Sequence, residues 1–429
     1  MQRLTQISLV GMLLLATFLS ITSIHSARAS GAVDYEPGQV VVKLAPLPGD
    51  GILGINQTYG TSTIASLFNH QDIFLLQAPP NVNVEQLVQV MANDPRLEYA
   101  ELNYINETPE DGSTNRIYGW GGQDPAPFRN QDATKTLRLG AAHNFSRGEG
   151  MIVAVLDTGA QLDHPALADS LGILGYDFVD NDPIPEDEAN GLDDDGDGQV
   201  DEMYGHGTHT TGIVHLVAPE ALILPVRVLN SDGRGNNFRT ANAILYAADS
   251  GADAINLSLG TAHPSALLGD AVDEAARLGV VVVAAAGNLN ATARQYPAAE
   301  ACAIAVTSVN SHDRKSSFAN YGDWIGVAAP GENIYSTFPV SGYAWASGTS
   351  MSTPFVAGQA ALLRSVNPGL TLDEIGLLIG GTAQSLDKAN PAYRGLLGEG
   401  LIDIVASLES QAAGSWPTPE HNLFADCIN

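Results

Sequence analysis

Three short motifs hold residue types that together can carry out nucleophilic catalysis. An aspartate ends VAVLD before a glycine turn, a histidine lies between the glycines of GHGTHTTG, and a serine lies in SGTSMSTP; these are Asp157, His206 and Ser350. A serine hydroxyl is a poor nucleophile until a base removes its proton, and a histidine base needs a carboxylate that fixes its tautomer and stabilises its cation. Alone, each residue has a plainer interpretation as a cap, a turn former or a structural histidine. Together they predict a Ser-His-Asp triad that forms an acyl-enzyme.

Apolar runs in the second part of the chain are expected to position these residues. The runs MIVAVLD, ALILPVRVL, DAINLSLG, VVVVAAAGN and AIAVTSV are nearly continuous, which is typical of strands buried on both faces of a parallel sheet. FRTANAILYAADSGA and SALLGDAVDEAARLG lie between them and are long enough for crossover helices. The pattern predicts a layered α/β domain whose functional loops lie at the carboxyl ends of the strands.

The rest of the chain divides by composition. Arg3, an apolar run from about Leu9 to Ile24, and Ala27-Arg28-Ala29 fit a secretory signal that is cleaved after Ala29. An uncleaved membrane anchor is the alternative, but the run is shorter than the ~20 residues of a spanning helix. The expected divisions are a signal peptide at 1–29, a small α+β unit at 30–110, an exposed connector at 111–139, the α/β domain at 140–410 and a tail at 411–429.

Charge and cysteine content exclude some classes of function. The 429 residues include 19 Lys and Arg against 48 Asp and Glu, a formal net charge of -29. Such a chain is repelled by nucleic acid and by anionic membranes, so we expect neither as a partner. Only Cys302 and Cys427 are present, which excludes a disulfide framework. A buried free thiol at Cys302 is favoured over a bridge to the tail, although the sequence leaves the pairing open.

The order Asp, His, Ser is that of subtilisin. With DTG, GHGTHTTG and GTSMSTP in this order, residues 140–408 resemble the subtilase family of serine proteases (peptidase S8). The resemblance implies a subtilisin-like three-layer fold with a mainly parallel sheet, and the triad Asp157, His206 and Ser350. It also implies that Asn288, at the end of VVVVAAAGN, donates its amide to the oxyanion together with the Ser350 backbone N–H.

The same resemblance implies a substrate cleft. Its walls would be two segments of small residues that leave room for an extended peptide, with one further glycine on the opposite side. These residues are Ser258, Leu259, Gly260, Ala285, Ala286 and Gly287, and opposite them Gly233. Leu289 follows Asn288 with no fixed positive charge nearby, so we expect a preference for apolar or aromatic side chains before the scissile bond.

The block 30–110 resembles the inhibitor-like propeptides of this family, with VVVKL near its start and DPRLEYAELNY near its end. The resemblance implies a propeptide that assists folding, occupies the cleft as an intramolecular inhibitor and is removed by self-cleavage. We expect the cut between about Asn106 and Arg116. The alternative is a permanently attached ligand-binding domain.

An acidic run before the histidine motif predicts calcium binding. Asp193-x-Asp195-x-Asp197-Gly198 repeats the first part of a calcium loop, in which alternate carboxylates converge on a hard cation. The expected ligands are Asp193, Asp195, Asp197, the backbone carbonyl of Gln199, and Asp201. Tyr204 stands where an EF-hand has its bidentate Glu, so this is a calcium loop without an EF-hand. The alternative is a solvated acidic surface.

A second calcium site is not expected in its usual family form, because Ala166 replaces an aspartate. Asp163 and the acids around Asp177 to Glu188 could rebuild it. The sequence thus predicts a secreted, monomeric serine endopeptidase that acts on proteins or peptides and is supported by calcium. A dedicated processing protease and an inactive calcium-binding secreted module are the alternatives.

Overall fold

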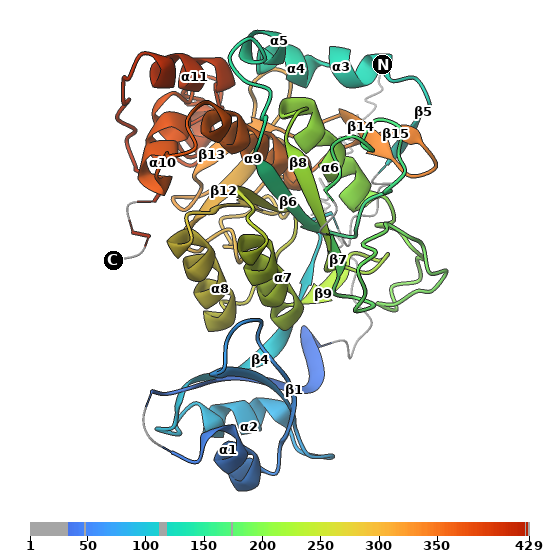
Figure 1. Ribbon diagram of the computed structural model, residues 1–429, viewed down its shortest axis with the longest axis vertical. Coiled ribbons are helices and arrows are strands. Elements are labelled where there is room, and N and C mark those ends of the chain that lie inside the picture. Colours follow the sequence, from blue (N-terminus) through green and yellow to red (C-terminus); the bar gives the residue numbers. More distant parts are fainter. Residues whose placement is uncertain (1–32, 47–48, 111–117, 173–174, 425, 428–429) are drawn as a thin grey trace, which may run out of the picture.

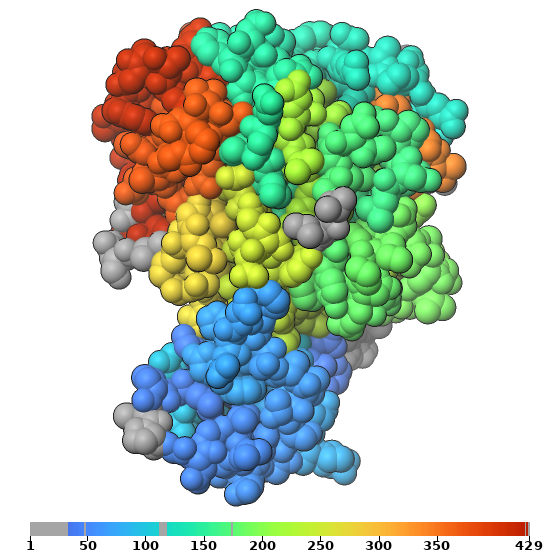
Figure 2. Space-filling model, in the orientation of Figure 1, coloured from blue at the N-terminus to red at the C-terminus, as the bar shows by residue number. Residues whose placement is uncertain are grey.

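The computed structural model describes residues 33–46, 49–110, 118–172, 175–424, 426 and 427. The expected signal peptide lies outside these residues. Figure 1 shows a small N-terminal unit below a larger α/β domain, and Figure 2 shows the two bodies in contact.

The N-terminal unit is an antiparallel sheet covered on one face by two helices. Its elements are β1 (Tyr35–Leu44), α1 (Gly51–Tyr59), β2 (Ser62–Ser66), β3 (Ile73–Gln77), α2 (Val84–Met91) and β4 (Leu97–Glu107). The strand order is β2-β3-β1-β4, and β4 continues into an antiparallel pair with β9 (Arg234–Asn236) of the larger domain. Ile55 and Met91 pack against Val40 and Val42 in a core of its own. The predicted α+β character is confirmed.

A parallel sheet of seven strands forms the centre of the larger domain, in the order β13-β12-β11-β10-β6-β8-β7. The strands are β6 (Ile152–Asp157), β7 (Tyr176–Asp177), β8 (Leu222–Arg227), β10 (Ala254–Leu257), β11 (Val281–Ala285), β12 (Ala303–Val309) and β13 (Val327–Pro330). After β6 the chain first adds β7 and β8 on one side and then β10 to β13 on the other. The carboxyl end of β6 is therefore a topological switch point, where open α/β sheets bind their ligands.

Helices cover both faces of this sheet. They are α6 (His206–Val217), α7 (Asn237–Asp249), α8 (Ala266–Arg277), α9 (Thr349–Val366), α10 (Leu372–Gly381) and α11 (Ile404–Ala412), with a short 3₁₀ turn at Pro391–Tyr393. One core cluster joins the sheet to α6 and α9, and a second joins it to α7 and α8. The predicted three-layer α/β/α fold is confirmed (Figure 1).

The second half of the expected connector differs from an exposed linker. It forms two short helices, α3 (Ala126–Asn130) and α4 (Asp132–Thr136), and a third, α5 (Leu139–Ala142), begins at its last residue. Phe128 and Leu137 are buried in the core cluster of α6 and α9. Just before them, β5 (Gly119–Gly122) adds to the hairpin of β14 (Ile334–Phe338) and β15 (Gly342–Ala346). This segment belongs to the larger domain because its few apolar side chains are buried there.

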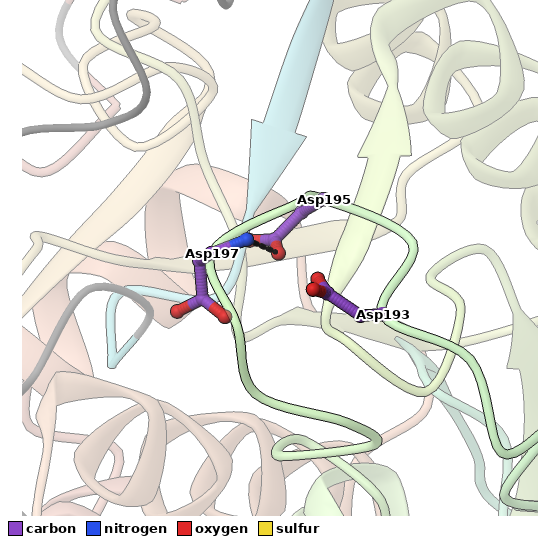
Figure 3. A group of neighbouring side chains, drawn as sticks. All are labelled: Asp193, Asp195 and Asp197. Atoms are coloured by element: carbon purple, nitrogen blue, oxygen red, sulfur yellow. Dashed lines mark hydrogen bonds between the residues drawn. The ribbon is translucent and has the colours of Figure 1, made fainter.

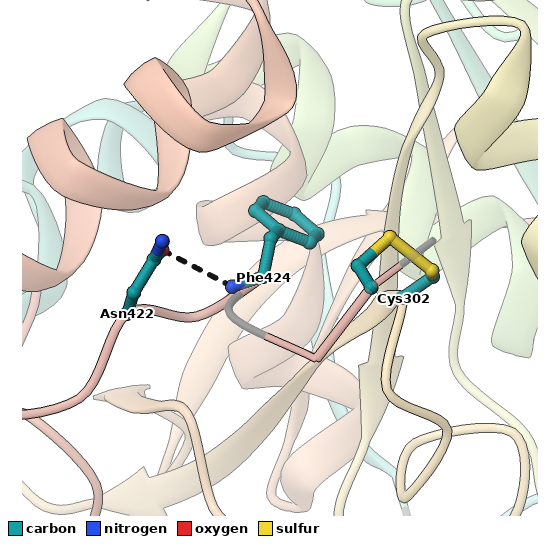
Figure 4. Close-up of a disulfide and its surroundings, with 4 residues drawn as sticks. Cys302, Asn422 and Phe424 are labelled. Atoms are coloured by element: carbon teal, nitrogen blue, oxygen red, sulfur yellow. Dashed lines mark hydrogen bonds between the residues drawn. A yellow bond between two sulfur atoms is a disulfide. The ribbon is translucent and has the colours of Figure 1, made fainter. Parts of the chain in front are cut away.

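The tail is joined to the larger domain by a disulfide. Cys302 is buried as predicted, but it is bonded to Cys427, with their Cα atoms 4.7 Å apart (Figure 4). The favoured free thiol is therefore wrong. The physical reason is that the tail folds back onto the domain, where the Phe424 side chain is buried in the core cluster of α6 and α9. This docking brings Cys427 to the start of β12.

Candidate active site

Two residues of the predicted triad meet at the carboxyl edge of the sheet. Asp157 is the last residue of β6, and His206 is the first residue of α6. The distance from His206 Nδ1 to Asp157 Oδ1 is 2.7 Å, and both side chains are fully buried. Asp157 also accepts hydrogen bonds from the Thr158 backbone N–H and from Thr210 Oγ1. These donors fix the orientation of the carboxylate.

Ser350 lies in the first turn of α9, and a carboxylate stands between it and His206. Ser350 Oγ donates to Glu110 Oε2 at 2.6 Å, and His206 Nε2 lies 3.2 Å from the same oxygen. Burial lowers the pKa of His206, but the adjacent carboxylates of Asp157 and Glu110 outweigh this and raise it to about 10. In this state His206 holds its proton. Sequence reasoning missed Glu110, whose only signal was its position at the end of the expected propeptide.

Asn288 faces the other oxygen of the same carboxylate. Its Nδ2 donates to Glu110 Oε1 at 2.9 Å. Its Oδ1 accepts from both the backbone N–H and the hydroxyl of Thr349, each at 3.0 Å, which sets the orientation of the amide. Gly348 leaves the room for this contact, because a Cβ there would lie 1.7 Å from Glu110 Oε1. The arrangement aims an amide donor at an anionic oxygen beside Ser350.

The end of the N-terminal unit lies in a cleft between two strands. On one side, Asn106 and Glu107 pair with Gly235 and Arg234 of β9, and the Thr108 N–H donates to the Gly233 carbonyl at 3.2 Å. On the other side, Glu107 and Gly260 exchange two backbone hydrogen bonds of 2.9 Å. An extended peptide is thus held by backbone pairing from both sides.

The residues expected to line the cleft fall into two groups. Gly233 and Gly260 pair with the N-terminal unit, and the Ser258 hydroxyl donates to the Ser350 carbonyl at 2.9 Å. Ala285 ends β11, Ala286 and Gly287 follow it directly, and the Gly287 N–H donates to Thr349 Oγ1. This second segment therefore supports the start of α9 and, through Thr349, the Asn288 amide.

Strand β4 also caps two helices of the larger domain. The Glu101 carboxylate accepts from the Ser265 hydroxyl and from the backbone N–H of Ala266 at the start of α8. Asn103 Oδ1 accepts from the backbone N–H of Phe238 in the first turn of α7. Both contacts satisfy amides that a helix start leaves unpaired. The contacts fix the position of β4 and so the depth to which its end enters the cleft.

Asp187 is a buried carboxylate that sequence reasoning did not connect with the triad. It accepts from the Gly205 N–H at 3.1 Å and from the Thr208 N–H at 3.0 Å, at the start of α6. It also accepts from Thr158 Oγ1, which in turn accepts from the backbone N–H of Gly207. Gly205 has no side chain with which to cap α6. Asp187 therefore ties the turn after Asp157 to the helix that begins with His206.

The acidic run brings its alternate aspartates together, as the spacing predicted. Asp193, Asp195 and Asp197 offer carboxylate oxygens that lie within 4.8 Å of one another (Figure 3). The backbone N–H groups of Gly196 and Gly198 donate to Asp193 and shape the turn. These hard oxygen ligands, on a loop held open by glycines, fit a calcium ion.

Asp201, another of the expected ligands, lies at the base of the loop. Its carboxylate accepts from the Asn190 N–H at 2.8 Å and from the Gly191 N–H at 3.0 Å, so it closes the base of the loop. Gln199 Nε2 donates to Asp197. Beside them, both carboxyl oxygens of Glu202 are buried and have no hydrogen-bond donor among the described residues. Burial first, and then the nearby acids, raises the pKa of Glu202 to about 8.

Several acids between Asp177 and Glu188 form ion pairs with a buried arginine, Arg227. Arg227 Nη1 lies 2.8 Å from Asp177 Oδ2 and 2.8 Å from Asp180 Oδ2, with Glu188 at 3.5 Å. Asp163 accepts from Gln161 Nε2. A guanidinium therefore pairs with three of the acids that could have rebuilt a second calcium site: Asp177, Asp180 and Glu188.

Comparison with known proteins extends over most of the chain. The model of the subtilase family matches residues 148–400, and that of the fervidolysin N-terminal prodomain matches residues 22–103. Thermitase from Thermoactinomyces vulgaris is 46% identical over 252 residues, which cover 56% of this chain and 85% of thermitase. A thermophilic serine proteinase from Bacillus sp. (strain AK1) is 42% identical over 296 residues, covering 66% of this chain and 67% of that protein.

Among solved structures, the crystal structure of fervidolysin from Fervidobacterium pennivorans, a keratinolytic enzyme related to subtilisin, superposes with a TM-score of 0.70 at 22% identity. The superposition covers 87% of this chain and 61% of fervidolysin. It includes both bodies of the chain and shows that they share the fold of that protein.

Proposed function

The chain belongs to the subtilase family of serine endopeptidases and carries a fervidolysin-like prodomain, and from this premise we propose that Asp157, His206 and Ser350 are its catalytic triad. One observation carries the proposal: a single carboxylate oxygen lies within hydrogen-bond distance of both Ser350 Oγ and His206 Nε2, while His206 Nδ1 faces Asp157. A substrate carbonyl that replaces this carboxylate would meet the nucleophile and its base together.

The proposed reaction has two halves. Ser350 Oγ bonds to the scissile carbonyl carbon while its proton passes to His206 Nε2, and Asp157 stabilises the imidazolium. The oxygen of the tetrahedral intermediate accepts from the Asn288 amide and from the Ser350 N–H. His206 then gives its proton to the leaving amine. Water, deprotonated by His206, attacks the acyl-enzyme and releases the second product with Ser350 restored.

Proteins and peptides that can adopt an extended conformation are the proposed substrates. The N-terminal unit supports this, because its end is held as an extra strand between Gly233 to Asn236 and Gly260. The exposed Leu289 beside Asn288 fits the expected preference for apolar or aromatic side chains.

We propose a precursor that is exported and processed. The proposed parts are a signal peptide at 1–29, a propeptide at 30–110 that inhibits intramolecularly, a connector at 111–139 whose second half packs into the catalytic domain, that domain at 140–410 and the tail at 411–429. The match of the prodomain and its strand in the cleft support the inhibitor role. Within the described part of the chain, no helix combines the length and the apolar character that crossing a membrane requires. A monomer remains the expected state.

Labelling with a fluorophosphonate tests the proposed function. Such a probe bonds only to an activated serine, so we expect it to modify Ser350 once the propeptide has been removed. Peptide mapping locates the modified residue, and a digest of unfolded casein is run in parallel. Modification of any other residue would overturn the triad. Labelling of Ser350 without digestion of casein would instead point to a processing protease for one partner peptide.

We further propose that Asp193, Asp195 and Asp197 hold a structural calcium ion, with the Gln199 carbonyl and with Glu202 near by. The convergence of the carboxylates and the donor-free oxygens of Glu202 support this. A bound cation would cancel the repulsion and order the loop that leads into α6. Asp201 contributes by closing the base of that loop.

Calcium removal is therefore expected to lower the melting temperature. Binding at a hundredfold excess over Kd stabilises the native state by about 2.7 kcal/mol, which corresponds to about 5 to 10 °C. The melting temperature is measured in calcium and in EDTA on the Ser350→Ala chain, so that self-digestion does not contribute. Asp195→Asn should abolish the difference, whereas Asp163→Asn, a matched change outside the loop, should preserve it. Equal melting temperatures of the Ser350→Ala chain with and without EDTA would contradict the calcium site.

A further inference from the structure

Glu110 fills the position where the reaction would develop a negative oxygen. Its carboxylate accepts from Ser350 Oγ and Asn288 Nδ2 and lies against His206 Nε2. It is 4% exposed, so water contributes little to holding it. The Asn288 amide, which should stabilise a substrate oxyanion, therefore binds the side chain of a residue in the same chain.

The register of the strands explains why a side chain reaches this place. Glu107 and Gly260 form a hydrogen-bonded antiparallel pair, and the next such pair along the ladder would be Pro109 with Ser258. Proline has no N–H to donate to the Ser258 carbonyl. That carbonyl instead lies 3.4 Å from Ser350 Oγ, as its acceptor. The ladder thus stops one residue before the carboxylate that contacts the nucleophile.

We propose that Pro109 and Glu110 form a stop that resists cleavage, in which the oxyanion site acts as a carboxylate-binding site and Glu110 is its ligand. The proposal rests on the triad proposed above. It adds that the bond between Pro109 and Glu110 is not the processing site and that the cut lies C-terminal to Glu110. The propeptide then keeps Glu110 after the cut and remains an inhibitor until it dissociates.

Charge makes a carboxylate a better ligand than a neutral group here. His206 carries a proton in this state, with its pKa raised by the two carboxylates that flank it. Hydrogen bonds between charged partners are about twice as strong as those between neutral ones. Glu110 therefore acts twice: it engages Ser350 Oγ, and it keeps His206 in the form that cannot accept a proton. A glutamine has the same shape but lacks the charge.

The first test compares labelling rates in the full chain. The unaltered chain, Glu110→Gln and a matched control, Glu98→Gln, are treated with a fluorophosphonate before the propeptide dissociates. Glu98 lies in the same unit at the start of β4, where it pairs with Lys43. We expect Glu110→Gln to label about ten- to hundredfold faster than the unaltered chain, and Glu98→Gln to label at the unaltered rate. Equal rates for all three chains would overturn the stop.

The second test locates the cut and does not depend on how Glu110→Gln folds. Intact mass of the matured, unaltered enzyme should place its N-terminus after residue 110, and Pro109→Ala should add a product that begins at residue 110. An unaltered enzyme that begins with Glu110 would overturn the proposal. Labelling of the propeptide-free enzyme separates a failure of the stop from a failure of the proposed triad. If Ser350 is modified there, a negative result in either test above overturns the stop alone. If Ser350 is not modified, the proposed function fails and the stop fails with it.

Discussion

Replacement of Ser350 by alanine is expected to lower kcat about a millionfold, which is the loss known for the corresponding serine of subtilisin. The hydroxyl is the group that bonds to the scissile carbon, so neither His206 nor Asn288 can compensate. Because the same hydroxyl would carry out self-cleavage, the variant should also keep its propeptide. The fold should not change, since the Ser350 hydroxyl contacts Glu110 and the Ser258 carbonyl only through hydrogen bonds.

Intact mass in a protease-deficient host measures whether the propeptide is retained, with Ser365→Ala as the matched control. Ser365 lies in the last turn of the same helix, and its exposed hydroxyl donates to the Glu149 carbonyl. The unaltered chain and the control should lose the propeptide, while Ser350→Ala should retain it. If all three chains have the same mass, another protease trims the precursor or the site is inactive, and the assignment of Ser350 fails.

The central sheet was predictable because each of its strands can be identified from its own sequence, without knowing which strand it pairs with. A strand buried on both faces is apolar at every position, and the AIAVTSV run matches β12 from Ala303 to Val309. The strands β14 and β15 were not predicted. Their mixed sequences, IYSTF and GYAWA, show no clean alternation, and their pairing depends on tertiary contacts with β5.

The members of the candidate site divide in the same way. Asp157, His206 and Ser350 stand in long motifs at strand ends and helix starts, so local sequence was enough to select them. Glu110 stands in a stretch rich in proline and acids, where nothing local distinguishes it. Its place depends on the depth at which β4 enters the cleft, which the helix caps of Glu101 and Asn103 determine.

The disulfide and the position of Asp201 depend on contacts and backbone conformation that local sequence patterns do not show. Cys302 and Cys427 are separated by 125 residues, and their pairing depends on the docking of Phe424, which no local pattern shows. In the acidic loop, spacing predicted the convergence of the first three aspartates. Asp201, however, has a φ of 54°, which takes its side chain back to the Asn190 and Gly191 amides. Alternate spacing applies only while the backbone conformation stays regular.

Replacement of Asn288 by alanine is expected to lower kcat by about 10² to 10³ and to change KM little. The magnitude is the one known for the corresponding amide of subtilisin. The physical reason is that the amide donates to an oxygen whose charge develops only in the transition state, so its loss weakens binding of the transition state more than binding of the substrate. The contact with Glu110 supports this role, because a carboxylate oxygen resembles that charged oxygen more closely than a neutral carbonyl does.

Kinetics on a peptide substrate measure both constants after the propeptide has dissociated, and Thr349→Val provides a graded comparison. Valine keeps the backbone N–H that donates to Asn288 Oδ1 but removes the hydroxyl that donates to the same oxygen at 3.0 Å. In Thr349→Val the Asn288 amide still donates but is held by one contact in place of two. This substitution should therefore lower kcat less than Asn288→Ala does. If Asn288→Ala instead raised KM at an unchanged kcat, the side chain would bind the substrate in its ground state, and stabilisation of the oxyanion would have to come from the Ser350 N–H alone.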